Sequence, residues 1–198
     1  MRKEVWVDFE TTGLDVNTCD IHQIGVVCEG YQFAMDITFD WSKLKHDLPI
    51  DVTVKRVHIS EAAKEFVDFI MFLADIFHVT FEKADKFRFC GKNTKFDWRL
   101  MERFLATVNV DIYELFHYTP LDLESVAVFL RDAELLPADF PMKLGEMISY
   151  FQEKGFDIFH GDLHRGLNDA KNSQTIYRFL VMKTYSLVNG RKQGNPFT

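Results

Sequence analysis

The alternation of apolar and polar positions indicates strands near the start of the chain. Short runs of β-branched and aromatic residues, which favour strands, cover residues 5–9, 21–28, 31–39 and 86–90. Gly30 separates the second run from the third and suits a hairpin turn. We therefore expect the first three strands to form an antiparallel meander.

Five later segments have apolar residues every three or four positions, which is the spacing of one helical face. We expect helices over residues 60–77, 94–107, 125–135, 143–154 and 169–186. Ser60 can cap the first of them, whereas residues 40–58 are irregular. A meander of strands followed by alternating strands and helices predicts a mixed α/β layer fold.

Size and charge then limit the possibilities. The chain has 198 residues, 47% of them hydrophobic, which is enough to bury the core of one domain. We expect that domain over residues 1–190 and a mobile tail over residues 191–198. The net charge of −7 argues against a broad basic surface for non-specific binding of nucleic acid. It leaves open a nuclease that holds a single strand end through metal ions.

The cysteines and the apolar runs indicate the cellular compartment in which the protein works. The three cysteines form no close-spaced pair, which argues against a zinc finger and a disulfide framework and favours a reducing cytoplasm. Two acids interrupt the apolar start of the chain, so a signal peptide is not expected. The most apolar run, residues 66–81, also contains acids, and no membrane span is predicted.

Two carboxylates, Asp8 and Glu10, end the first predicted strand. Residues two apart in a strand point to the same side, with Cα atoms ~6.5 Å apart. Both side chains could therefore bind one cation, and a divalent metal would explain two charges beside an apolar strand. A strand end whose acids reach solvent explains the pair equally well.

Two further acids lie at predicted helix starts. Thr94 could cap the helix that contains Asp97, and an acid there is favoured by the helix dipole, so Asp97 has a structural explanation as well as a functional one. The dipole argument also applies to Asp169. However, His164 precedes Asp169 by five residues, and a loop histidine there could take a proton from a metal-bound water.

Taken together, the motifs resemble the DEDDh (DnaQ-like) family of 3′–5′ exonucleases, in the ribonuclease H-like superfamily. Three segments match in order: Asp8–Leu14, Asn93–Asp97 and His164–Ala170. The resemblance covers about residues 5–180. It implies an α/β fold with a mixed five-stranded sheet flanked by helices, and hydrolysis of nucleic acid from the 3′ end to 5′-mononucleotides.

The resemblance also implies roles for single residues. It assigns two Mg²⁺ (or Mn²⁺) ions to four catalytic acids, Asp8, Glu10, Asp97 and Asp169. His164 would be the general base. The substrate-binding residues expected with this interpretation are Thr11, Thr12, Gly13, Leu14, Asn93, Phe96 and Arg165, with Leu14 packing on the terminal base. One departure is Lys92, which stands where many members have a histidine.

The nature of the nucleic acid is less determined than the reaction. Residues 116–122 faintly resemble oligoribonucleases, whereas residues 11–15 resemble DNA proofreaders, so a single-stranded DNA 3′ end is only slightly favoured over short RNA. A polymerase or another replication or repair protein is one option for a partner. Basic residues around the second motif, Lys92, Lys95, Arg99 and Arg103, could contact phosphates but are more simply explained as solvated helix charges.

Two other functions are open. The pattern His160-x-Asp162-x-His164 is loosely similar to the two-histidine, one-carboxylate site of an Fe(II)-dependent oxygenase. Such enzymes usually have all-β barrels, and this assignment would leave the other acids unexplained; an exposed loop is the plain alternative. A non-catalytic docking module is the second option, although an unused site has no reason to keep buried like charges.

Overall fold

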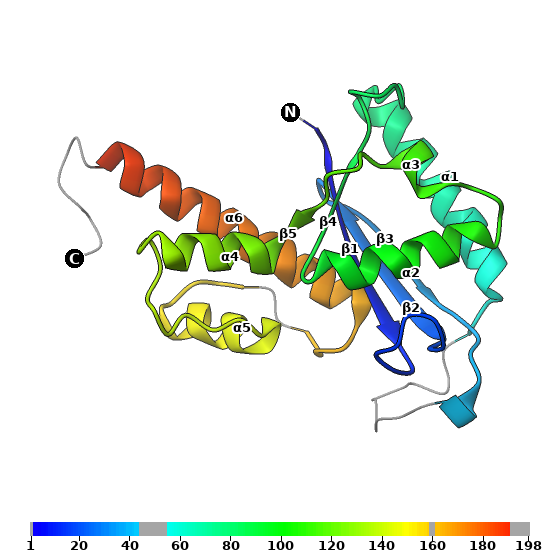
Figure 1. The fold of residues 1–198 in the computed structure, drawn as a ribbon, viewed down its shortest axis with the longest axis horizontal. Coiled ribbons are helices and arrows are strands. Elements are labelled where there is room, and N and C mark those ends of the chain that lie inside the picture. Colours follow the sequence, from blue (N-terminus) through cyan, green and yellow to red (C-terminus); the bar gives the residue numbers. More distant parts are fainter. Residues whose placement is uncertain (1, 44–54, 159–160, 191–198) are drawn as a thin grey trace.

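The architecture is a five-stranded sheet with helices on both faces (Figure 1). The computed structural model describes residues 2–43, 55–158 and 161–190. The strands are β1 (Glu4–Thr11), β2 (Ile21–Cys28), β3 (Tyr31–Asp36), β4 (Arg88–Gly91) and β5 (Leu121–Asp122), in the order β3-β2-β1-β4-β5. The β1–β2 and β2–β3 pairs are antiparallel, and the β1–β4 and β4–β5 pairs are parallel. The predicted mixed five-stranded α/β sheet is thus confirmed.

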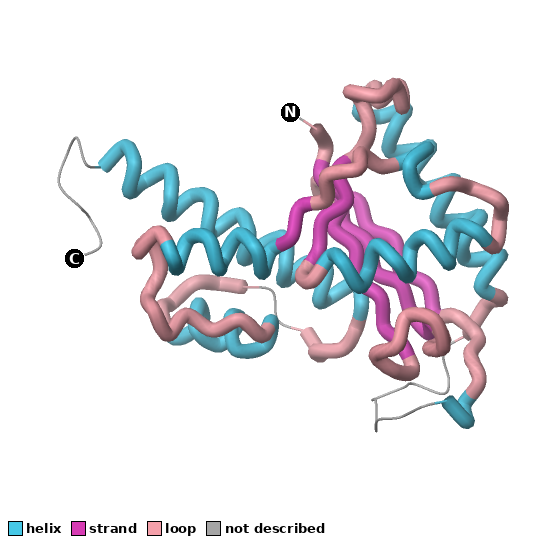
Figure 2. Tube along the Cα trace, viewed as in Figure 1, coloured by secondary structure: helices cyan, strands magenta, loops and turns pink. Residues whose placement is uncertain are grey.

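Alternation along β1 divides the core into two. The helices are α1 (Ile59–Phe77), α2 (Thr94–Ala106), α3 (Ile112–Leu115), α4 (Leu123–Asp132), α5 (Leu144–Glu153) and α6 (Gly166–Gly190), and a 3₁₀ turn, η1, spans Trp41–Lys43. Val7 and Phe9 point into the cluster formed with α1, α2 and α3, whereas Trp6 points into the cluster formed with α4, α5 and α6. Figure 2 shows the two groups of helices on opposite sides of the strands. Asp8 and Glu10 share the side of Trp6.

Some predicted boundaries were wrong. The third strand ends at Asp36 rather than residue 39. The cap of α1 is His58, whose side chain accepts a hydrogen bond from the Ser60 backbone N–H, so Ser60 is not the cap. Helix α6 begins at Gly166, three residues before the expected start at Asp169. Elements α3 and β5, of four and two residues, were not predicted because segments so short show no periodicity.

The hairpin at Gly30 is confirmed, with Glu29 and Gly30 both at positive φ (47° and 95°). Part of the predicted irregular segment, residues 44–54, and the predicted tail, residues 191–198, lie outside the described residues. Within the part of the chain that is described, no helix has both the length and the apolar character needed to cross a membrane.

The first turn of α6 lies directly on the sheet. A Cβ added to Gly25 of β2 would lie 1.9 Å from the Leu167 backbone nitrogen, and one added to Gly166 would lie 2.9 Å from the Asp8 carbonyl oxygen. Only glycines permit this backbone-to-backbone approach. It brings the start of α6, with Asp169, next to the acids of β1.

Candidate active site

Four acids from three elements meet near the carboxyl end of β1. Asp8 and Glu10 lie on β1, Asp97 lies in the first turns of α2, and Asp169 lies in the first turns of α6. Burial and then the negative charges of Asp97, Glu10 and Asp169 raise the pKa of Asp8 well above its ordinary value. The four sequence-predicted acids therefore share one electrostatic environment.

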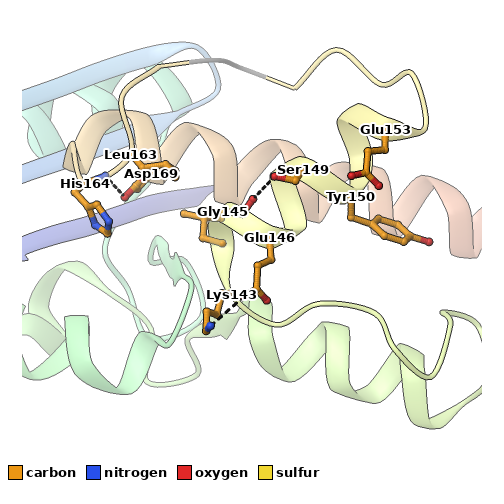
Figure 3. Close-up of a pocket in the computed structure, with 10 residues that line it drawn as sticks. Lys143, Gly145, Glu146, Ser149, Tyr150, Glu153, Leu163, His164 and Asp169 are labelled. Atoms are coloured by element: carbon orange, nitrogen blue, oxygen red, sulfur yellow. Dashed lines mark hydrogen bonds and ion pairs between the residues drawn. The ribbon is translucent and has the colours of Figure 1, made fainter.

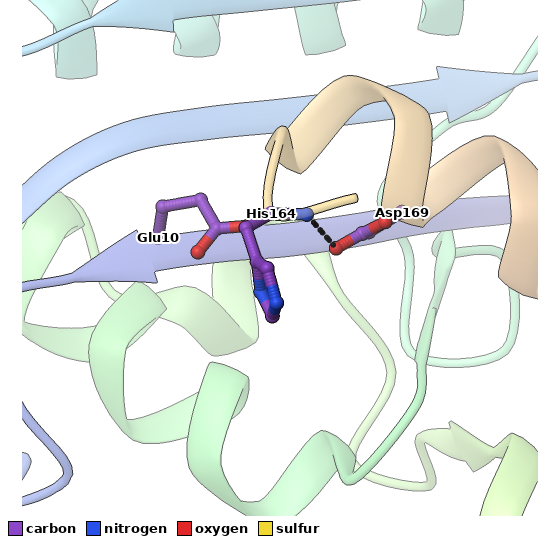
Figure 4. Close-up of side chains that lie close together, drawn as sticks. All are labelled: Glu10, His164 and Asp169. Carbon is purple, nitrogen blue, oxygen red and sulfur yellow. Dashed lines mark hydrogen bonds between the residues drawn. The ribbon is translucent and has the colours of Figure 1, made fainter. Parts of the chain in front are cut away.

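The tightest part of the site is formed by Glu10, His164 and Asp169 (Figure 4). One potential ligand atom from each of them lies within 4.8 Å of the others. Burial and the charge of Asp169 raise the pKa of Glu10 to about 7, while Arg165 acts in the opposite direction. His164 is exposed and has a left-handed backbone (φ 62°), a conformation that is uncommon outside glycine.

Asp169 has one carboxylate oxygen without a partner. The side chain is 7% exposed, and its Oδ2 accepts a hydrogen bond from the His164 backbone N–H at 3.1 Å. Its Oδ1 is buried and makes no hydrogen bond within the described part of the chain. Burial raises the pKa of Asp169 to about 6. A buried, unpaired oxygen among four carboxylates fits a ligand for a hard divalent cation such as Mg²⁺ or Mn²⁺.

Asp97 is held differently. It is 4% exposed, and its Oδ1 accepts a hydrogen bond from the Phe9 backbone N–H of β1 at 3.3 Å. Burial is the main reason that the pKa of Asp97 rises to about 8, and the charges of Glu10 and Asp122 add to it. The metal group within 4.8 Å includes neither Asp97 nor Asp8.

The start of α2 differs from the predicted cap. Asn93, not Thr94, occupies the N-cap position, with φ 62° and no side-chain capping bond. Thr94 instead donates through its backbone N–H (2.6 Å) and its hydroxyl (3.1 Å) to Asp122 Oδ2. The other oxygen of Asp122 accepts from the Ser125 backbone N–H at 2.7 Å and so caps α4. One carboxylate therefore fixes two helices against β5.

Sequence reasoning missed Asp122 and Gln23. Gln23 of β2 is 8% exposed, and its Oε1 accepts from the Gly166 backbone N–H at 2.7 Å, which anchors α6 as Asp122 anchors α2. An acid just before an apolar helical run is a capping signal, so Asp122 could have been found had the helix start not been assigned to Ser125. Nothing local in the sequence indicates the role of Gln23.

The predicted substrate residues differ in accessibility. Leu14 is 83% exposed and Asn93 is exposed, whereas Phe96 and Arg165 are half-buried. Thr12 is 1% exposed, and its hydroxyl accepts from the Asp20 backbone N–H at 2.9 Å. The last two predicted contacts, Thr11 and Gly13, are joined by a hydrogen bond, in which the Thr11 hydroxyl donates to the Gly13 carbonyl at 2.7 Å.

A groove leads from the acids along α5. It has a volume of about 630 Å³ and runs from His164 and Asp169 past Leu163 to the α5 residues between Lys143 and Glu153 (Figure 3). Its wall on the α5 side contains both Lys143, which pairs with Glu146 at 3.0 Å, and Tyr150. The groove is large enough for about one nucleotide-sized ligand beside the acids.

Two of the basic residues near the second motif are not solvated helix charges. The Arg103 guanidinium donates to the Val16 carbonyl and, at 3.1 Å, to the Cys19 carbonyl, so it holds the loop after β1. Lys92 pairs with Glu124 at 3.1 Å, and its side chain is 20% exposed. These contacts argue against phosphate binding by Arg103, whereas the charge of Lys92 acts on the acids by lowering the pKa of Asp8.

The alternative iron pattern has little support. His160 lies outside the described residues. Asp162 is exposed, and its carbonyl accepts from the Asn168 side chain. Among the described residues, the His164 imidazole groups with Glu10 and Asp169 rather than with Asp162.

Comparisons with known proteins identify the fold. No family model matches the chain, and no curated protein matches it. Among solved structures, it is similar to S. pombe Pop2p in its Mg²⁺- and Mn²⁺-bound form (TM-score 0.61, 12% identity, 92% of this chain and 83% of that one). It is also similar to cell-death related nuclease 4, CRN-4 (0.66, 15%, 92% and 64%), and to exonuclease I (0.62, 13%, 93% and 41%).

At these identities the likeness concerns the fold alone. The chain has the ribonuclease H-like α/β fold of these neighbours. It spans less than two thirds of CRN-4 and of exonuclease I.

Proposed function

We propose that this protein is a metal-dependent 3′–5′ exonuclease that releases 5′-mononucleotides from a single-stranded 3′ end, and that residues 1–190 form its single catalytic domain. The observation that carries the proposal is the buried Asp169 Oδ1, unpaired within the described residues, in a cluster of four acids. A cluster of like charges that raise one another's pKa is costly to keep without a cation. The likeness to nucleases in fold supports the same assignment.

The residues present fit two Mg²⁺ or Mn²⁺ ions, which Asp8, Glu10, Asp97 and Asp169 would hold. When bound, such ions stabilise negative charge on the attacking and leaving oxygens of a phosphodiester. Glu10 and Asp97, with pKa values of about 7 and about 8, must lose their protons before they can act as ligands, so metal binding releases protons near neutral pH.

His164 is proposed as the general base. Its imidazole lies beside Glu10 and Asp169 and is exposed, so a ring nitrogen can take the proton of the attacking water and pass it to solvent. Histidine is the side chain that exchanges protons most readily near neutral pH. The hydrogen bond from its backbone N–H to Asp169 couples the position of the base to that of a metal ligand.

The proposed substrate contacts follow from accessibility. Leu14, the most exposed of the predicted contacts, would pack against the terminal base, and Asn93 and Arg165 would contact the sugar–phosphate chain. Thr12 is buried and would support the loop rather than touch substrate. We propose DNA as the slightly favoured substrate and short RNA as the alternative. A polymerase or repair protein is one option for a partner, and the cytoplasm is the proposed location.

End-labelled oligonucleotides test the proposal. A 3′ label should appear at once as a mononucleotide, and a 5′ label should appear in a ladder of progressively shorter strands, with Mg²⁺ or Mn²⁺ but not with EDTA. Parallel digestions of single-stranded DNA, duplex DNA and short RNA would establish the substrate. Cleavage into internal fragments, or no cleavage with any divalent ion, would contradict the proposal, and turnover that needs Fe(II) and oxygen would support the oxygenase instead.

A further inference from the structure

Lys92 lies next to Asp8 at the end of the parallel β1–β4 pair. The last registered pair is Trp6 opposite Cys90, and Lys92 directly follows the end of β4 at Gly91. A Cβ added to Gly91 would lie 3.0 Å from the Val7 carbonyl oxygen and 3.8 Å from Asp97 Oδ2, so the chain enters Lys92 beside the acids. Trp6 and Cys90 share the core under α4 and α6, alternation places Asp8 on that same side, and the ion pair of Lys92 with Glu124 of α4 places the lysine there too.

The Lys92 side chain is fixed rather than solvated. It is 20% exposed, and its Nζ is 3.1 Å from Glu124 Oε2 in the first turn of α4. Because little of this side chain is exposed to water, its charge acts on the nearby acids with little screening. Accordingly, Lys92 lowers the pKa of Asp8, whereas Asp97, Glu10 and Asp169 raise it.

The spacing of the potential ligand atoms also differs between the two halves of the site. Glu10, His164 and Asp169 have ligand atoms within 4.8 Å of one another, and the free oxygen of Asp169 belongs to this half. In the other half, the Asp97 carboxylate accepts a backbone N–H, and Asp8 is acted on by the charge of the lysine. Only the first half therefore combines close ligand spacing with an oxygen left unpaired among the described residues.

We propose that the Lys92 ammonium takes the place of most of the second ion's charge, so that the protein binds one divalent ion tightly and a second one only weakly. This inference rests on the metal site of the proposed function and deepens it. One divalent ion together with Lys92 and Arg165 would balance the four acids, because solvent screening lets Glu124, at 42% side-chain exposure, offset only part of the Lys92 charge.

The test is Mn²⁺ binding to the whole chain without substrate, measured by calorimetry and by the loss of the free Mn²⁺ resonance signal at about pH 8. The wild type should bind one ion tightly and a second at least about tenfold more weakly. Lys92→Gln should tighten the second ion by about tenfold or more, because the repulsive charge is gone, whereas Lys92→Arg should not. Lys95→Gln is the matched control, since Lys95 is exposed and lies three residues away.

A separate variant keeps the inference testable if Lys92→Gln fails to fold, which a thermal melt will show. Glu124→Gln leaves Lys92 in place without its partner, and the second ion should then bind still more weakly than in the wild type. Two ions of equal affinity in the wild type would overturn the inference. So would equal tightening by Lys92→Gln and Lys95→Gln, or an unchanged second ion in Glu124→Gln.

The outcomes separate this inference from the proposed function. A chain that digests 3′ ends but binds two equal ions contradicts the role of Lys92 and leaves the nuclease intact. A chain that binds one ion tightly, with the expected effect of Lys92→Gln, but cleaves no nucleic acid contradicts the nuclease and leaves the role of Lys92 intact.

Discussion

The starts of α2 and α6 are built alike, yet the acid in each makes different hydrogen bonds and has a different pKa. Asp97 and Asp169 are each the fourth residue of their helix, and in each helix the first backbone N–H is held by a side chain of the sheet, Asp122 or Gln23. Asp97 accepts from the backbone of β1, whereas Asp169 accepts from the loop that carries His164 and keeps one oxygen unpaired among the described residues.

This difference shows that the position in a helix does not by itself decide what an acid does. With a pKa of about 6, Asp169 is ionised at neutral pH and ready to bind a cation. With a pKa of about 8, Asp97 keeps its proton until a cation displaces it. We therefore infer that Asp169 belongs to the tight metal site and Asp97 to the weak one.

The largest expected effect separates these two acids directly. Asp169→Asn should abolish the tight ion and slow cleavage by about 10³-fold or more, because it replaces the ionised ligand with an amide. Asp97→Asn should keep the tight ion, which Mn²⁺ calorimetry would reveal beside the cleavage rates. If Asp97→Asn loses the tight ion and Asp169→Asn keeps it, the assignment of the two halves is reversed.

His164→Ala tests whether the histidine is a base or a ligand. As a general base it should contribute about 10²-fold to the rate of cleavage, with Mn²⁺ affinity changed by less than about threefold. A parent-like rate would contradict the base assignment. Loss of the tight ion would instead make His164 a metal ligand with Glu10 and Asp169, as their spacing also permits.

The pH dependence of stability sharpens the comparison without any mutation. The folded-state pKa values of Glu10, Asp97 and Asp169 all lie above the ordinary values near 4, so the folded state binds more protons at these groups than the unfolded chain does. Burial lowers the pKa of His22 to about 4, which opposes them only below about pH 6.5. The contribution of these three acids to the stability of the folded state is complete below about pH 4 and is lost as the pH rises through about 8. The metal-free Tm should fall over this window, by about 5 °C or more, and Mn²⁺ should remove most of the slope. A metal-free Tm that rises across it would contradict the site's electrostatics.

The smallest expected effect concerns the anchors. Asp122→Ala removes acceptors from the starts of both α2 and α4 and should lower the free energy of unfolding by about 1–2 kcal/mol. Gln23→Ala removes one acceptor from α6 and the Nε2 donor to Asp36, and should cost about 1 kcal/mol. Urea denaturation would compare them, and an equal or larger cost for Gln23→Ala would show that the anchors are not ranked by their bonds.

The sequence was informative where a pattern repeats locally. The strands of the meander and the five long helices follow from periodicity, and β2 was predicted with its observed bounds. The early start of α6 was missed because Gly166 is a poor helix former, and the bond that holds it comes from Gln23, 143 residues away. The acids were found as motifs, but their grouping, and the asymmetry between Asp97 and Asp169, depends on contacts distant in sequence.

The central claim is that acids from β1, α2 and α6 share a divalent-cation site beside His164. Its most direct test is an anomalous difference map from crystals of the protein grown with Mn²⁺. We predict a strong peak in contact with Glu10 and Asp169 and a weak or absent second peak near Asp8 and Asp97. A map with no peak among these four acids, while the protein is saturated with Mn²⁺ in solution, would contradict the account.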